Sequence, residues 1–374
     1  MPEDTADYRR LFVNNIPMMD VRAPVEFAHG AFPTAVNLPL MDDSERERVG
    51  IRYKEAGQAA ALTLGHELVR DEVKANRVAA WVRFAREHPG GVLYCFRGGM
   101  RSAISQQWLR EAGVDYPRVL GGYKAMRQYL LEALTCIPGT LDLHILGGRT
   151  GSGKTRVLER IQPAVDLEAL ANHRGSGFGR RATPQPAQID FENAVAVALL
   201  KHEAAGGGPL LLEDESRNIG SRSIPEALRV AMRSAPLVVL EVPFEARVTV
   251  ILEDYVIGTA GEFAGLYPPA EAFQRFAGHL RASLDRIRRR LGHERHARLR
   301  GLMDTALEAQ REGLDASLHR QWIARLLSEY YDPMYDYQLS LNRERLAFRG
   351  EYPEVVDHLA RQGFTVEAGA WVSG

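Results

Sequence analysis

Short apolar runs alternate with stretches of helical hydrophobic spacing along the first third of the chain. Short apolar runs at 19–27, 29–33 and 35–40, broken by turn-forming Gly, Pro and Asn residues, predict short strands joined by turns, and a further short strand is predicted at 92–94. Apolar positions at helical spacing predict three helices: 73–88, Ser102 to about Glu111, and a last helix ending at about Leu134. A further short strand is predicted at 119–120, before Gly121-Gly122. This alternation predicts a small α/β domain with a parallel sheet.

A second α/β pattern follows a short linker at 136–140, Cys136-Ile137-Pro138-Gly139-Thr140. Three apolar runs predict its strands: 141–146, 209–216 and 237–242. From about residue 258 the pattern is mainly helical. We therefore predict one domain over 1–135 and a second over 141–374, which includes a helical, arginine-rich region at about 258–330.

Composition narrows the class of protein. The chain has 374 residues, of which 45% are hydrophobic and 25% charged, a balance typical of a folded globular protein. No apolar run approaches the roughly 18 residues of a membrane helix, and the acidic N-terminus does not resemble a secretory signal. Two cysteines provide neither a disulfide framework nor a four-cysteine zinc site. We expect a cytoplasmic protein without a membrane partner, whose oligomeric state the sequence does not indicate.

Positive charge is concentrated in one segment although the net charge is only −1. Residues 281–300 hold eight arginines against Asp285 and Glu294. Such an excess is typical of contact with a polyanion, and the alternative is a solvated helix face. The candidates for polyanion contact are Arg286, Arg288, Arg289, Arg290 and Arg295.

A phosphate-binding P-loop is the strongest motif. It follows a predicted strand, precedes a helix, and consists of Gly148, Thr150, Gly151, Ser152, Gly153, Lys154 and Thr155 together with the intervening Arg149. Backbone N–H groups would surround phosphate oxygens, Lys154 would add a positive charge, and Thr155 could hold a magnesium ion. Asp214, after an apolar strand, is the expected metal-facing carboxylate, with Glu213 or Glu215 as alternatives. No metal site is certain.

A cysteine loop is the second candidate site. Cys95 ends a predicted strand and is followed by Arg97, Gly98, Gly99 and Arg101 before the next helix. Loop N–H groups, a helix N-terminus and two arginines would favour a thiolate and would also bind an oxyanion. The alternative is a buried small hydrophobic residue, which suits Cys136 better.

A glycine-rich basic loop at 173–181 is the third candidate. His173, Arg174 and Ser176 suit a flexible anion-binding loop, and Phe178 could stack on a base. A mobile surface loop without a ligand would have the same composition.

These motifs together resemble a known family. Asp20-Val21-Arg22, Ala35-Val36-Asn37-Leu38-Pro39, the Cys95 loop and Gly121-Gly122-Tyr123 resemble a rhodanese domain. Fused ahead of the P-loop, that domain is similar to the bacterial tRNA 2-selenouridine synthases. The tracts at 173–179, Pro184-Gln185-Pro186 and Glu213-Asp214-Glu215-Ser216 also match this family. The resemblance covers nearly the whole chain and is weakest after about residue 260.

The resemblance implies a function that composition and spacing do not give. The family is a transferase that converts 2-thiouridine at the wobble position of certain tRNAs to 2-selenouridine. Geranyl diphosphate first alkylates the sulfur, and selenium from selenophosphate then replaces the S-geranyl group. Cys95 matches the cysteine that carries selenium as a selenyl sulfide. The implied partners are tRNA and a selenophosphate-producing enzyme, with no tightly bound cofactor.

Two alternatives stay open at this point. Five residues separate Cys95 from Arg101, whereas typical single-domain sulfurtransferases have four; the longer loop is that of cysteine-dependent phosphatases. A phosphatase would need a general acid, which the sequence does not identify. A rhodanese-type sulfurtransferase fused to a P-loop kinase or NTPase would turn over nucleotide. A tRNA-binding protein with a vestigial rhodanese module is disfavoured by the intact Cys95 and Lys154.

Overall fold

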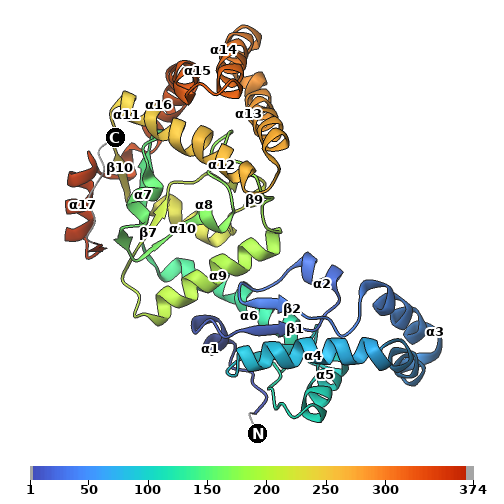
Figure 1. Cartoon of the computed structure of the whole chain (residues 1–374). Coiled ribbons are helices and arrows are strands. Elements are labelled where there is room, and N and C mark those ends of the chain that lie inside the picture. The colour runs from blue at the N-terminus through green and yellow to red at the C-terminus, as the bar shows by residue number, and fades with distance from the viewer. Residues whose placement is uncertain (1–2, 368–374) are drawn as a thin grey trace. The chain divides into compact units, whose positions relative to one another are not determined.

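The computed structural model describes residues 3–367, which form two compact units (Figure 1). The first comprises the chain up to Ile137 together with Ala187–Ala205. The second comprises Pro138–Pro186 and the chain from Gly206 onward. The chain first passes from one unit to the other between Ile137 and Pro138, within the linker predicted at 136–140. The prediction treated 141–374 as one continuous domain, whereas here Ala187–Ala205 joins the first unit.

The first unit is built on a three-stranded parallel sheet. β1 (Met18–Asp20) lies between β2 (Ala35–Asn37) and β3 (Val92–Tyr94). All residues of β1 and β3 are buried, because helices cover the sheet. The strand predicted at 119–120 is reduced to isolated parallel bridges, Leu93 with Arg118 and Thr5 with Val119.

Seven helices belong to this unit among the described residues: α1 (Tyr8–Val13), α2 (Pro24–His29), α3 (Asp43–Leu68), α4 (Asp71–Glu87), α5 (Met100–Glu111), α6 (Gly122–Cys136) and α9 (Gln188–Ala204). The strand prediction was wrong between β1 and β2, because Pro24 begins helix α2 and no strand lies at 29–33. The three predicted helices are confirmed as α4, α5 and α6. They enclose a core that includes Met19, Trp81, Leu93 and Trp108. Burial of these large apolar side chains is the main stabilising contribution to the unit.

Helix α9 packs against α1 and α6. Fully buried Asn193 donates from Nδ2 to the carbonyl of Ala31 at 2.6 Å and accepts from Arg127 Nη1 at 2.7 Å. Asp190 Oδ1 accepts from the backbone N–H of Ala31 at 2.6 Å. These polar contacts add to the buried apolar residues of α9, so α9 is an integral helix of the first unit.

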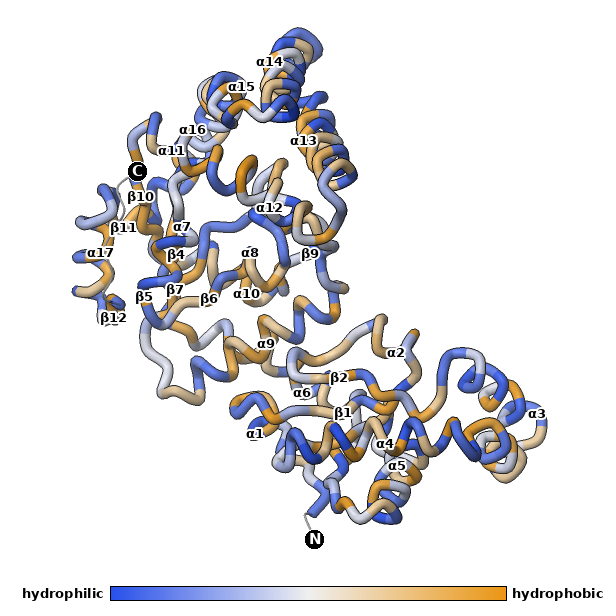
Figure 2. The backbone as a smooth tube through the Cα atoms, viewed as in Figure 1, coloured by the Kyte–Doolittle hydropathy of each residue, from blue (hydrophilic) through white to orange (hydrophobic). Residues whose placement is uncertain are grey.

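The second unit contains a five-stranded parallel sheet with the order β11-β10-β4-β7-β6. Its strands are β4 (Asp142–Gly148), β6 (Ala164–Val165), β7 (Pro209–Glu213), β10 (Leu237–Leu240) and β11 (Leu346–Gly350). The central strands are buried and hydrophobic (Figure 2), as their apolar runs predicted. The α/β prediction with parallel sheets is confirmed.

Helices flank this sheet and then form a separate helical layer. The flanking helices are α7 (Lys154–Leu158), α8 (Leu167–Leu170), α10 (Glu226–Ser234) and α17 (Tyr352–Arg361). The helical layer comprises α11 (Phe244–Ile251), η2 (Leu252–Ile257), α12 (Gly258–Ala264), α13 (Pro269–Leu291), α14 (His293–Arg311), α15 (His319–Leu326), η4 (Leu327–Tyr331) and α16 (Asp332–Leu341). The predicted helical region, about 258–330, is therefore confirmed and extends further at both ends. It has its own apolar core, which includes Phe276, Leu284, Met303 and Trp322.

Short elements complete the unit: the 3₁₀ turns η1 (Ile137–Thr140), η3 (Ala316–Leu318) and η5 (Arg343–Arg345), the antiparallel pair β5 (Ile161–Gln162) and β12 (Thr365–Val366), and the hairpin of β8 (Asn218–Ile219) and β9 (Arg222–Ser223). Between residues 3 and 367, no helix is long and apolar enough to cross a membrane.

Candidate functional site

The P-loop joins β4 to α7 in the second unit. Gly151 and Gly153 have φ of +82° and +71°, left-handed conformations that glycine adopts without strain. Among the described residues, the backbone N–H groups of Gly151, Gly153 and Lys154 find no acceptor in the protein. Lys154 Nζ lies 3.2 Å from the carbonyl oxygen of Gly148. The loop thus presents several donors and one cation to a polyphosphate.

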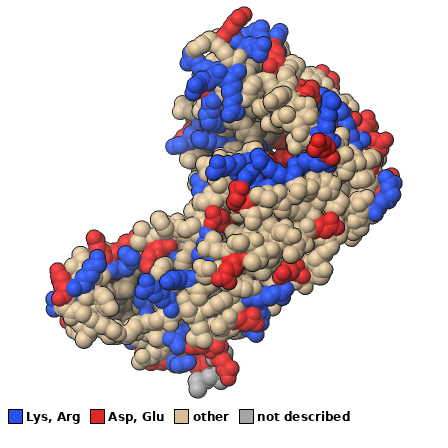
Figure 3. Space-filling model, turned by 180° about the vertical axis from the view of Figure 1, so that it is seen from behind, with Lys and Arg blue, Asp and Glu red and all other residues tan. Residues whose placement is uncertain are grey.

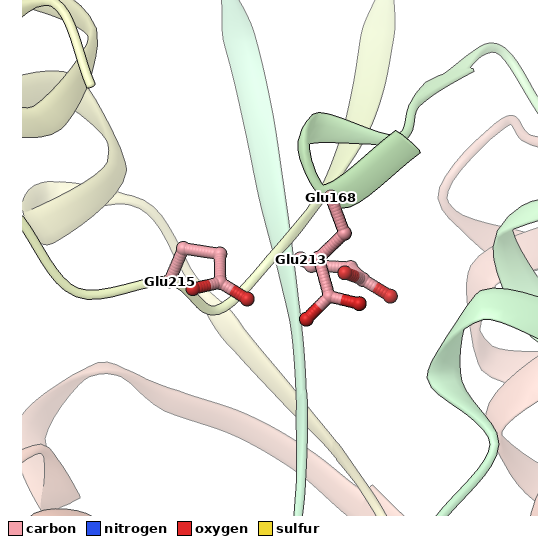
Figure 4. A group of neighbouring side chains, drawn as sticks. All are labelled: Glu168, Glu213 and Glu215. Carbon is pink, nitrogen blue, oxygen red and sulfur yellow. The ribbon is translucent and has the colours of Figure 1, made fainter. Parts of the chain in front are cut away.

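Three glutamates meet beside this loop. Figure 4 shows the carboxylates of Glu168 from α8, Glu213 at the end of β7 and Glu215 pointing toward one another. One oxygen from each lies within 4.8 Å of the others. Thr155 Oγ1 donates to Glu213 Oε1 at 3.3 Å, while the buried Glu213 Oε2 has no partner.

Burial dominates the electrostatics of this cluster. Burial and, after it, the charge of Glu168 raise the pKa of Glu213 to about 8, although Lys154 and Thr155 act in the opposite sense. The pKa values of Glu168 and Glu215 are also raised, mainly by burial. A divalent cation would offset the repulsion among these oxygens, and carboxylate and hydroxyl oxygens are ligands that Mg²⁺ prefers. The unpartnered Glu213 Oε2 fits such an ion.

The metal-facing position differs from the main expectation. Asp214 pairs with Arg345, at 3.7 Å between Oδ1 and Nη2. Glu213, weighed as an alternative, is the residue that contacts Thr155. Neighbouring residues of a strand point to opposite faces, and the apolar run alone does not indicate which of them turns toward the P-loop.

The glycine-rich loop is ordered by the helical layer. Arg174 pairs with Glu262 at 2.9 Å, and Ser176 Oγ donates to Tyr255 Oη at 3.3 Å. Phe178 is only 5% exposed and stacks on Trp322, with ring centroids 5.7 Å apart. The suggestion that Phe178 stacks on a base is therefore wrong, because its ring is part of the core.

A basic cleft of about 680 Å³ adjoins this loop. Its lining includes His173, Ser176, Arg180, Arg286, Arg289 and Arg290. Within the described chain, none of these four arginines forms an ion pair with a carboxylate. Figure 3 shows basic side chains gathered beside a hollow in this unit. An unneutralised positive cleft suits a nucleic-acid backbone.

Arg288 and Arg295, two of the five arginines predicted to contact a polyanion, lie outside the cleft. His173 lines the cleft but carries no positive charge at pH 7. Arg288 Nη2 lies 3.1 Å from His293 Nδ1, and Arg295 donates to the carbonyl of Glu329. Neither lines the cleft. Burial and nearby arginines lower the pKa of His173 to about 4, so its imidazole is neutral at pH 7.

The Cys95 loop joins β3 to α5 in the first unit. Cys95 is 3% exposed, and its thiol donates to Ser102 Oγ at 3.3 Å. Among the described residues, the backbone N–H groups of Phe96, Arg97 and Gly98 have no protein acceptor. Backbone N–H groups without a protein acceptor can donate to an oxyanion. The expectation that Cys136 would be the buried cysteine was wrong, because Cys136 is exposed and Cys95 is buried.

Arg101 is fixed by a carboxylate that was not among the candidates. Its Nη1 and Nη2 donate to Glu26 at 2.5 and 3.0 Å. This bidentate pair holds the guanidinium beside the loop. There, against the effect of burial, the Glu26 carboxylate raises the pKa of Arg101, and Cys95 adds a smaller effect in the same direction. Glu26 and Glu168 are the functional candidates that sequence reasoning missed. Glu168 lies outside the P-loop motif and carries no local signal, whereas Glu26, with Phe27, belongs to the stretch that resembles a rhodanese domain but was not singled out as a site residue.

Known proteins resemble this chain over the P-loop unit and over nearly its full length. The sequence model of the tRNA 2-selenouridine synthase AAA domain matches residues 141–365. A relative from Pseudomonas savastanoi pv. phaseolicola, named tRNA 2-selenouridine synthase, is 54% identical over 96% of this chain and 98% of its own. Relatives of the same name from Bordetella bronchiseptica and Azotobacter vinelandii are each 55% identical, over 97% and 96% of this chain and 99% and 97% of their own.

Among solved structures, the N-terminal domain of a protein from Clostridium difficile 630 aligns with 31% of this chain and 89% of its own at 32% identity. Its TM-score of 0.28 is too low to support an argument. The family match and the curated relatives, by contrast, cover the P-loop unit and nearly the full chain. The chain therefore belongs to the tRNA 2-selenouridine synthase family.

Proposed function

We propose that this protein converts 2-thiouridine at the tRNA wobble position to 2-selenouridine, with S-geranyl-2-thiouridine as the intermediate. Its near full-length relatives carry the name tRNA 2-selenouridine synthase, so it is a tRNA-modifying transferase. The observation that carries the two-step scheme is the presence of two different anion cradles. One contains a lysine and acidic oxygens, and the other a buried cysteine.

The P-loop is assigned to geranylation. Its N–H groups and Lys154 bind the diphosphate of geranyl diphosphate, and Glu213 with Thr155 would hold a magnesium ion that neutralises the departing pyrophosphate. The sulfur of 2-thiouridine attacks C1 of the geranyl group, and the C–O bond breaks with its electron pair leaving on pyrophosphate. The N3 proton of the nucleobase is released. Glu215, whose pKa is raised to about 7 mainly by burial, is partly ionised at pH 7 and can accept it.

The Cys95 loop is assigned to selenation. Selenium from selenophosphate forms a bond to C2, and geranyl thiolate leaves with the electrons of the C–S bond. Water takes the phosphoryl group, so the products are 2-selenouridine, geranyl thiol and phosphate, without a net redox change. We place Cys95 at selenium delivery. A selenyl sulfide on Cys95 would need a two-electron oxidant to form, so in the direct route above Cys95 lies beside the donor and is not bonded to selenium.

The basic cleft is assigned to tRNA. Arg286, Arg289 and Arg290 line it with Arg180, beside the loop that contacts the P-loop unit's helical layer. Backbone phosphates are the ligands that such unpaired arginines bind.

Nucleoside mass spectrometry after reaction with a 2-thiouridine anticodon stem-loop tests the division of labour. Lys154→Ala should leave 2-thiouridine, since loss of one group that stabilises developing charge typically costs about 10²–10³ in rate. Cys95→Ala should stop at S-geranyl-2-thiouridine, whereas the control Cys136→Ala should complete the reaction.

Pre-geranylated RNA should restore selenation to the Lys154 variant and not to the Cys95 variant. If folded Cys95→Ala also fails to geranylate, the two-site scheme is wrong. Hydrolysis of ATP by the wild type without geranyl transfer would instead support the kinase or NTPase alternative.

A further inference from the structure

A large apolar pocket opens beside the Cys95 loop. Its volume is about 320 Å³, and its walls include Leu40, Leu62, Val69, Ile104 and Trp108. This lies at the lower end of the roughly 300–1,000 Å³ typical of small-molecule sites. The proposed chemistry of Cys95 leaves this pocket without a role.

Helix α3 forms the pocket by folding over it. At Gly57, φ is +79° and the helix breaks into two halves. Val49 and Tyr53 line the pocket from the first half, and Ala61 and Leu62 line it from the second. The break therefore encloses a space that a straight helix would not cover.

The pocket and the cysteine loop share residues. Met100 and Arg101 directly follow the Gly98-Gly99 turn of the loop, and both line the pocket. Cys95 belongs to the same hydrophobic cluster as Leu40 and Trp108. A ligand that reacts at Cys95 can therefore extend an apolar tail into the pocket.

The reacting groups differ in their need for such a space. Selenophosphate is small and anionic, so the loop N–H groups suit it and an apolar wall does not. A uracil ring is polar at its edges. The displaced geranyl group, in contrast, is a branched hydrocarbon of ten carbons attached to the sulfur that leaves.

We propose that this pocket binds the geranyl chain of S-geranyl-2-thiouridine during selenation. The inference rests on the proposed function and specifies which substrate the Cys95 site selects. With the chain in the pocket, the sulfur and C2 lie beside the loop. Selenium then bonds to C2 while the C–S electron pair departs with geranyl thiolate, which stays in the pocket until it is released.

A series of alkylated RNAs tests this selection on the wild-type protein. Anticodon stem-loops carrying S-geranyl-, S-dimethylallyl- or S-methyl-2-thiouridine are incubated with selenophosphate, and kcat/KM for selenation is measured. All three release alkyl thiolates, while each buried methylene strengthens binding about fourfold. We expect kcat/KM to fall from geranyl to methyl by roughly 100-fold or more. Equal values for the three RNAs would overturn the assignment.

A pocket-filling variant tests the location. Ala61→Trp places a large ring in the pocket and should reduce the preference for S-geranyl over S-methyl RNA at least tenfold. Ala59 is exposed on the same helix and does not line the pocket, so Ala59→Trp should keep the wild-type preference. An unchanged preference in folded Ala61→Trp would place the chain elsewhere. If circular dichroism shows that Ala61→Trp does not fold, Leu62→Asn, which makes the pocket wall polar, should likewise reduce the preference for S-geranyl over S-methyl RNA. The series of alkylated RNAs on the wild-type protein tests the assignment independently of both variants.

The proposed function fails in a different way. If the wild type selenates 2-thiouridine RNA but no S-alkyl RNA, the geranyl intermediate is wrong. If S-geranyl and S-methyl RNAs are converted equally well, the intermediate stands and only the pocket assignment is lost.

Discussion

Gly122 lies so close to the Cys95 loop that no side chain fits between them. A Cβ at this position would lie 2.5 Å from the backbone nitrogen of Gly98 and would overlap the carbonyl of Cys95. Its φ of +59° is also left-handed. The next two N–H groups, of Tyr123 and Lys124, bind the carbonyls of Cys95 and Phe96 at 2.9 Å each. These bonds turn the carbonyls outward and leave the loop N–H groups for a ligand.

Gly122→Ala should therefore distort the Cys95 loop. We expect selenation of pre-geranylated RNA to fall by about 10²-fold or more, in line with the loss of positioned donors. Geranylation by the same protein should be retained, because the P-loop belongs to the other unit. Single-turnover assays of the two steps measure both. Gly90, which has open space around it, provides the control Gly90→Ala, and equal activity of the two variants would contradict the role of Gly122.

Residues within one motif were predictable, and residues brought from elsewhere were not. The P-loop and the Cys95 loop each lie in a single strand–loop–helix segment, so spacing alone locates them. Glu168 reaches the P-loop from α8, and Glu26 reaches Arg101 from α2. Phe178 was predicted to bind a base because it lies in a glycine-rich, basic segment. Its ring instead stacks on Trp322 in the core, a contact that the sequence does not indicate.

Helix α13 divides its arginines between two faces. Arg286, Arg289 and Arg290 are related by three and four positions, so they share one face, and all three line the basic cleft. Arg288 lies on another face and contacts His293. The sequence predicted the arginine-rich helix, but which arginines face the cleft depends on how α13 packs through Leu284 and Ile287.

The double variant Arg289→Ala/Arg290→Ala should weaken tRNA binding and flatten its salt dependence. Each lost phosphate contact changes the slope of log K against log salt by roughly 0.7–0.9, so two contacts change it by about 1.4–1.8. Titrations of a tRNA anticodon stem-loop at several KCl concentrations give this slope. Arg288→Ala is the matched control and should leave the slope within error. A similar change in both proteins would show that the charge acts without regard to the cleft.

The two units are joined by more than a linker. Because α9 comes from the middle of the second unit's sequence and packs in the first, the chain passes between the units three times. The sequence did not predict this exchange: α9 buries residues such as Phe191, Asn193 and Leu200 around most of its circumference, so it shows no clear amphipathic stripe. The parallel sheets, by contrast, were predictable because their apolar runs are local.

Asn193→Ala should loosen the first unit selectively. It removes the donor to Ala31 and the acceptor of Arg127 in a fully buried position, which typically costs about 1–3 kcal/mol. We expect faster hydrogen exchange in peptides covering α6 and the segment around Ala31, with little change in β4 and β10. Glu203 lies on α9 like Asn193, and Glu203→Ala removes only its surface pair with Arg9 of α1, so the free energy of unfolding should change by less than about 1 kcal/mol. Uniform acceleration across both units would argue against a local role.

The position of α9 in the chain has a consequence for synthesis on the ribosome. The first unit has emerged up to Ile137 before its last helix exists, and roughly 70 further residues, including the P-loop, must be translated before α9 can dock. At about 5–20 residues per second, this interval lasts about 3–14 s. During it, the faces of α1 and α6 that α9 later covers stay exposed to chaperones and proteases. The first unit is therefore incomplete on the ribosome throughout the synthesis of the P-loop of the second unit.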